Sequence, residues 1–85
     1  MVQVEVELTN ETGLHARPAS LFVKKATQYQ SDIQVLKAGQ AASGKSLLAV
    51  LALGTHCGDK ILIRAEGVDE KEAVADLQFF IEHEL

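Results

Sequence analysis

The sequence has little of what secreted and membrane-spanning proteins usually carry. It contains one cysteine, Cys57, which excludes an internal disulfide and favours a reducing compartment. The longest apolar run, Leu47–Leu53, is far too short to cross a bilayer, and the alternating N-terminus holds no signal-peptide core. We therefore expect a soluble, cytoplasmic protein with no membrane insertion.

The sequence also lacks a surplus of positive charge. Lys and Arg number 8 and Asp and Glu number 12, so the formal net charge is −4. Nucleic acid is therefore an unfavoured partner, because binding to phosphates needs a basic surface. The 85 residues predict one domain, residues 1–85, with no room for a cavity enclosed between two domains. Any chemistry should sit on the surface, at a loop or at a helix end.

Apolar residues that alternate with polar ones predict four strands. The pattern is clear over residues 2–8 and 61–65 and weaker over 33–36 and 40–43. In the first strand the polar residues should face water, namely Gln3, Glu5 and Glu7.

Apolar residues at helical spacing predict three helices between these strands. The first should run from about His15 to Ala26, and a short buried helix is expected over 47–53, stopped by Gly54. The third should open with a capping box formed by Asp69 and Glu72. Its buried face should carry Ala73, Val74, Leu77, Phe80 and Ile81. The order β-α-β-β-α-β-α with short loops favours an α+β sandwich, a mostly antiparallel sheet with helices on one face.

The densest functional signal is the segment Gly13–Ala19, GLHARPA, at the start of the first helix. Free N–H groups of a first helical turn attract anions, and the positive helix end favours a neutral, nucleophilic imidazole at His15. A phosphoryl group on that ring could accept hydrogen bonds from the N–H groups of Ala16 and Arg17 and from the Arg17 guanidinium. Pro18 fits this turn because its missing N–H costs nothing there. On local chemistry alone, a His15 that merely caps the helix and a solvated Arg17 remain an equal alternative.

The segment Gly13–Ala19 resembles the active-site signature of the histidine-containing phosphocarrier family, HPr, of the bacterial phosphoenolpyruvate-dependent sugar phosphotransferase system. The resemblance covers nearly the whole chain in length, element order and the Lys45-Ser46-Leu47 segment before the run to Gly54. It implies an open-faced β-sandwich, with four antiparallel strands covered on one face by three helices. It also implies that His15 accepts a phosphoryl group from enzyme I and gives it to enzyme IIA, while Arg17 helps to hold the phosphate. The chain would then be a carrier and a substrate of other enzymes, without cofactor or metal, and a monomer.

The same resemblance implies a regulatory phosphorylation of Ser46 by a serine kinase. A purely regulatory module, read through Ser46 by a kinase, a phosphatase or a transcription regulator, is the runner-up hypothesis, although such a module would not need His15. The segment Ala42–Leu48 is closer to HPr-like domains of fructose-type and multidomain phosphotransferase proteins than to Gram-positive members. One short helix cannot bury all its leucines, so an exposed subset should dock partners: Leu47, Leu48 and Leu51.

Two weaker patterns predict other chemistry. Residues 39–46, GQAASGKS, match the nucleotide-binding P-loop pattern, but a P-loop needs a parallel sheet and a metal-binding Asp where Arg64 follows the next strand. We favour a turn at Gly39 followed by Ser46 as an N-cap. His56 and Cys57 are adjacent, which is too few ligands for zinc, and a surface turn is the better prediction.

Overall fold

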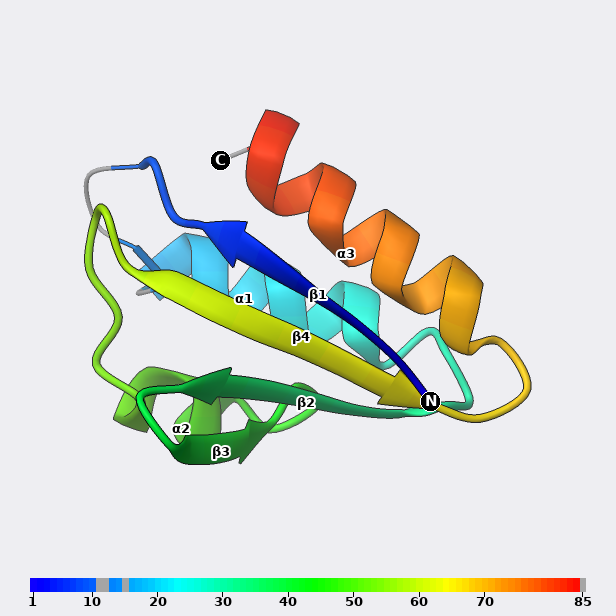
Figure 1. The fold of residues 1–85 in the computed structure, drawn as a ribbon. Coiled ribbons are helices and arrows are strands. Elements are labelled where there is room, and N and C mark those ends of the chain that lie inside the picture. Colours follow the sequence, from blue (N-terminus) through cyan, green and yellow to red (C-terminus); the bar gives the residue numbers. More distant parts are fainter. Residues whose placement is uncertain (11–12, 15, 85) are drawn as a thin grey trace.

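The computed structural model describes residues 1–10, 13–14 and 16–84, in which strands and helices alternate (Figure 1). In chain order the elements are β1 Val2–Glu7, α1 Ala16–Ala26, β2 Asp32–Lys37, β3 Gln40–Ser43, α2 Leu47–Ala52, β4 Lys60–Glu66 and α3 Glu70–His83. This is the order that the apolar periods predict.

The four strands form one antiparallel sheet in the order β1-β4-β2-β3. The central strand β4 places Ile63 between Val4 of β1 and Val35 of β2. Ala38 and Gly39 join β2 to β3 with φ of 50° and 83°, as a two-residue hairpin turn of type I′ requires. All three helices cover the same face of the sheet (Figure 1), so the predicted open-faced α+β sandwich is confirmed.

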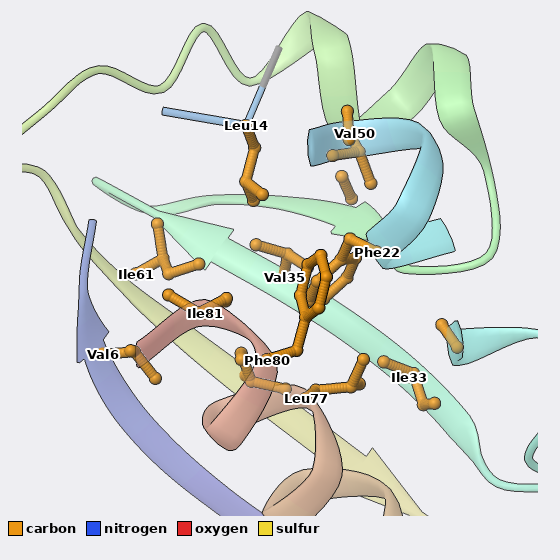
Figure 2. Close-up of a cluster of buried hydrophobic side chains, with 14 of the residues drawn as sticks. Val6, Leu14, Phe22, Ile33, Val35, Val50, Ile61, Leu77, Phe80 and Ile81 are labelled. Carbon is orange, nitrogen blue, oxygen red and sulfur yellow. The ribbon is translucent and has the colours of Figure 1, made fainter. Parts of the chain in front are cut away.

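The core lies between the helices and the covered face of the sheet. Figure 2 shows Phe22 of α1, Val50 of α2 and Leu77 of α3 gathered over apolar side chains of the strands. Alternation in β1 buries Val6 and leaves its polar neighbours exposed, as predicted: Gln3, Glu5 and Glu7. The predicted inward face of α3 is also confirmed, because all five residues are buried: Ala73, Val74, Leu77, Phe80 and Ile81.

Helix α2 is less buried than the sequence predicts. Val50 is its one fully buried residue, whereas 40% of Leu47 and 81% of Leu48 are exposed. A helix of six residues has fewer than two turns, so only one side of it can face the core. The predicted stop is confirmed, because the helix ends at Ala52 and Gly54 has a φ of 65°.

The predicted capping box at the start of α3 is wrong. Asp69 is the N-cap residue, but its side chain makes no capping hydrogen bond within the helix. Its carboxylate instead accepts from the backbone N–H groups of Gln30 and Ser31, each at 2.9 Å, and from the Ser31 hydroxyl. The side chain therefore ties α3 to the segment that enters β2, a tertiary contact with no counterpart in the local sequence pattern.

Candidate functional site

His15, on which the sequence-based hypothesis depends, lies outside the described residues, and so does the side chain of Ala16. The site is therefore described through its chain neighbours: the segment that ends at Leu14, the first turn of α1, and the elements packed against both. Figure 1 shows that these lie at one end of the sheet, where the segment after β1 and the segment before β4 run close together.

Gly13 forms a tight turn before α1. Its φ is 61°, its N–H donates to the Asn10 carbonyl at 3.3 Å, and its own carbonyl accepts from Asn10 Nδ2 at 2.8 Å. A Cβ at this position would lie 2.7 Å from the Thr55 carbonyl oxygen and 3.0 Å from the His56 Cα. The backbone at Gly13 thus packs directly against a second loop, and only glycine fits both the φ and the contact.

Leu14 anchors the residue before His15. Its side chain is fully buried and points into the core beside α2 (Figure 2). Its backbone N–H is buried as well and donates to the Thr55 hydroxyl at 2.9 Å. Because a buried N–H without a partner is costly, this contact fixes the chain where it approaches the helix.

The first turn of α1 contains no acidic residue and one cation, Arg17, which is exposed. Pro18 is half-buried in the same turn, and Ala19 and Phe22 hold the helix on the core. A helix leaves its first N–H groups without partners inside the helix, and those of Ala16 and Arg17 belong to this set. The arrangement therefore leaves positive potential at the helix start.

Helix α2 packs against α1 and begins with a side-chain cap. Ser46 is the N-cap residue, and its hydroxyl accepts the Ala49 N–H at 3.3 Å, as predicted. Leu47 and Leu48 present apolar surface beside it, whereas Leu51 is half-buried and packs on the core. Of the three docking candidates, Leu48 is thus the most accessible.

The loop of residues 54–59 contains site neighbours that the sequence analysis did not find. Lys37 Nζ donates to the Gly54 carbonyl at 2.9 Å and pairs with Asp59 at 2.9 Å. Asp59 also accepts the His56 N–H at 2.8 Å. The hydrogen bond from Lys37, followed by that from His56, holds the pKa of Asp59 below its usual range. No sequence motif signals this cluster, because β2 contributes Lys37 from far along the chain.

The two weaker sequence patterns take the structures that we favoured. Residues 40–43 form β3, paired with β2 in an antiparallel sheet, so the P-loop pattern lies in a hairpin rather than at a phosphate-binding loop. His56 and Cys57 are exposed in a turn. Among the residues described, no group of three or more His, Cys, Asp or Glu side chains could hold a metal ion.

The comparisons with known proteins agree with this fold. The family model described as the PTS HPr component phosphorylation site matches residues 2–83. The chain is 46% identical over 82 residues to the phosphocarrier protein HPr of Borreliella burgdorferi, covering 96% of this chain and 95% of that protein. A crystal structure of HPr from Thermoanaerobacter tengcongensis superposes with a TM-score of 0.95 at 43% identity, covering 96% of this chain and 92% of that one. The chain belongs to the HPr family of phosphocarrier proteins of the phosphotransferase system.

A relative with another name is also similar. The HPr-like protein Crh of Bacillus subtilis is 38% identical over 85 residues, covering 100% of both chains. Its crystal structure, described as a swapped dimer, has a TM-score of 0.79 and covers 100% of this chain and 98% of that one. The HPr relatives are named as carriers of phosphate and not as catalysts. In the described part of the chain, no helix is long and apolar enough to span a membrane.

Proposed function

We propose that His15 accepts a phosphoryl group from enzyme I and passes it to enzyme IIA proteins in the cytoplasm, with residues 1–85 acting as one carrier domain. The observation that carries this proposal is the match of residues 2–83 to a family model named for a phosphorylation site. Within the matched range, His15 stands in the GLHARPA segment directly before α1.

The chemistry requires a nucleophile and groups that hold the transferred charge. The Nδ1 atom of a neutral His15 attacks phosphorus, and the bond from phosphorus to the donor breaks as the new N–P bond forms. The phosphoryl oxygens then accept from the N–H groups of Ala16 and Arg17 and from the Arg17 guanidinium. The exposure of Arg17 and the absence of an acidic residue from the first turn of α1 support this role.

Partner proteins would dock on α1 and on the neighbouring α2, at Leu47, Leu48 and Leu51. Charge supports this face, because residues 13–58 contain a single acidic residue, Asp32, although the whole chain is acidic. Two cations of this range pair with carboxylates outside it, Lys25 with Asp76 and Lys37 with Asp59, and the others are Arg17, Lys24 and Lys45. A partner with an apolar patch and an acidic rim fits such a surface.

The test is phosphorylation by enzyme I and phosphoenolpyruvate. His15→Ala should accept no phosphate, and circular dichroism should show an intact fold. His83→Ala is the matched control, since His83 is exposed at the end of α3 and its ring is tilted by 34° against that of Phe79, with centroids 4.6 Å apart. The label should be acid-labile and alkali-stable, as an N–P bond on imidazole is. Full labelling of His15→Ala would refute the proposal.

A second function, regulation through Ser46, is favoured by the place of this residue. Its hydroxyl caps α2 directly before the exposed Leu47 and Leu48, so a phosphate there would change the docking surface. A serine kinase would phosphorylate Ser46, a phosphatase would remove the phosphate, and a transcription regulator would bind the phosphorylated chain. Incubation with such a kinase and ATP should give an acid-stable label that is lost in Ser46→Ala.

We propose that the carrier works as a monomer. The chain packs its own β1 against β4 along the whole strand, which supports a monomer that is complete in itself. The swapped dimer described for Crh is the alternative. Sedimentation equilibrium at micromolar concentration should give the mass of one chain, and a mass of two chains would refute the monomer.

A further inference from the structure

Thr55 stands at the centre of the contacts between the loop of residues 54–59 and the segment 13–14. It is fully buried, and it contacts the segment 13–14 in two ways. Its hydroxyl accepts the Leu14 N–H at 2.9 Å, and its carbonyl oxygen lies 2.7 Å from where a Cβ on Gly13 would be. Leu14 is the residue directly before the phosphoryl acceptor.

The loop that carries Thr55 is itself held from both sides. Lys37 of β2 fixes it through the Gly54 carbonyl and through Asp59, each at 2.9 Å. On the other side, the Leu8 N–H donates to the Asp59 carbonyl at 2.8 Å and the Leu8 carbonyl accepts the Gly58 N–H at 2.7 Å. The contacts from Lys37 and Leu8 thus fix the loop, and with it the position of the Thr55 hydroxyl.

We infer that Thr55 is a positioning residue for phosphoryl transfer: it holds the Leu14 N–H, and through it the backbone that carries His15. The inference rests on the proposed role of His15. Because Thr55 is fully buried, it acts on transfer through Leu14 and not by touching a partner. Transfer by in-line attack is sensitive to the placement of the nucleophile, so a looser Leu14 should lower kcat while partner binding is unchanged.

The variants are chosen to separate positioning from stability. Thr55→Val keeps the size of the side chain but removes the acceptor, and Thr55→Ser restores the hydroxyl. The matched control is Ser31→Ala, which removes another buried hydroxyl at the far end of the sheet, where it bonds Asp69. The readouts are kcat and KM for phosphorylation by enzyme I, and amide hydrogen exchange of Leu14 relative to Val35 in the core. The ratio to Val35 removes the contribution of global unfolding.

In Thr55→Val we expect kcat to fall about five- to tenfold, as loss of one hydrogen bond allows, with KM changed by less than about twofold. Leu14 exchange relative to Val35 should rise at least tenfold. In Thr55→Ser, kcat and the Leu14 exchange relative to Val35 should both lie within about twofold of the unsubstituted chain. Ser31→Ala should change neither of these two quantities. The inference would be overturned if kcat fell as much in Ser31→Ala as in Thr55→Val, or if kcat were unchanged in Thr55→Val.

Two further outcomes remain decisive. If Thr55→Val does not fold, Thr55→Cys under reducing conditions takes its place, because a thiol is a weaker acceptor of similar size. Equal kcat in the Cys and Ser variants would then overturn the positioning role. If the unsubstituted chain itself takes no label, the proposed function fails and this inference fails with it. If the unsubstituted chain is labelled and the Thr55 variants keep its kcat, the positioning role fails and the proposed function stands.

Discussion

Helices α1 and α3 begin in similar ways but with opposite charge. Each starts three residues after a glycine of positive φ, Gly13 before α1 and Gly67 before α3. The first turn of α3 contains acidic residues, and the Glu70 carboxylate accepts the Gly67 N–H at 3.1 Å, which lowers the pKa of Glu70. The first turn of α1 contains no acidic residue. The first turn of α3 therefore carries carboxylates at the positive helix end, whereas the first turn of α1 carries none, as the proposed binding of a phosphoryl group requires.

The loops beside the two helix starts also differ in chemistry. At α3, Ser31 donates its hydroxyl to the Asp69 carboxylate, so a charged group closes the contact. At α1, the acceptor for Leu14 is the neutral hydroxyl of Thr55. A carboxylate in place of the Thr55 hydroxyl would repel the phosphoryl group that we propose for His15. A neutral acceptor therefore suits the start of α1.

The largest expected effects are on stability, from a methyl group at either glycine. Gly13→Ala would meet the Thr55 backbone at 2.7 Å, and Gly67→Ala would meet the Ser31 Cα at 2.7 Å. Each should lower the free energy of unfolding by about 2–3 kcal/mol in urea denaturation. Gly39→Ala, with nothing within 4 Å of the new Cβ, should lose only about 1 kcal/mol. Equal losses at all three positions would show that strain in φ, and not loop contact, sets the cost.

The next effect separates the two helix starts by function. Arg17 and Lys71 are the second residues of α1 and α3, and both are exposed. Arg17→Ala should slow phosphorylation by enzyme I about ten- to a hundredfold, because a charge-assisted hydrogen bond is worth roughly 1.5–3 kcal/mol. Lys71→Ala should leave the rate unchanged in the same assay. Similar losses in both variants would mean that net charge, not the place of Arg17, governs transfer.

A smaller effect should appear in acid. The hydrogen bond from Ser31 holds the pKa of Asp69 below its usual range, and that from Lys37 does the same for Asp59. As the pH falls, these carboxylates take up protons in the unfolded chain before they do so in the folded chain. The stability that they contribute is therefore complete above about pH 4 and is lost as the pH falls through the folded pKa. Asp69→Asn and Asp59→Asn should each flatten the fall of Tm below about pH 4. At neutral pH only Asp59→Asn should slow phosphorylation, because Asp59 holds the Thr55 loop.

Much of the fold follows from sequence because its signals are local. Alternation predicts the strands, and helical spacing predicts the buried face of α3, since each depends only on which residues meet the core. The sequence predicts that some leucines of α2 are exposed, but it does not reveal which of them, because a short apolar run does not show which side of the helix meets the core. Asp69 shows the same limit from another side: it has the sequence of a capping box, but its partner is Ser31, far away in the chain.

The candidate site divides in the same way. The segment 13–19 predicts that a helix begins at about residue 15, and the structure has α1 from Ala16. The assignments to His15, Ala16 and Arg17 stay predictions, because His15 lies outside the described residues. Thr55 and Lys37 were not predicted, since their role depends on which loop the sheet brings next to Leu14. Such contacts are set by strand order, which no short motif contains.

The smallest effect is expected at Ser46, where the two roles of one residue can be told apart. Ser46→Asp keeps an N-cap acceptor at a positive helix end, so Tm should change little. The new charge lies at the edge of Leu47 and Leu48, and an acidic or apolar partner surface must face it on docking. KM for enzyme I should therefore rise about two- to fivefold with kcat unchanged, since one exposed charge is worth up to about 1 kcal/mol. Ser46→Ala is the matched control: it removes the acceptor for Ala49 and should cost about 1 kcal/mol of stability with KM unchanged. A lower Tm with unchanged KM in Ser46→Asp would mean that Ser46 is a cap and nothing more.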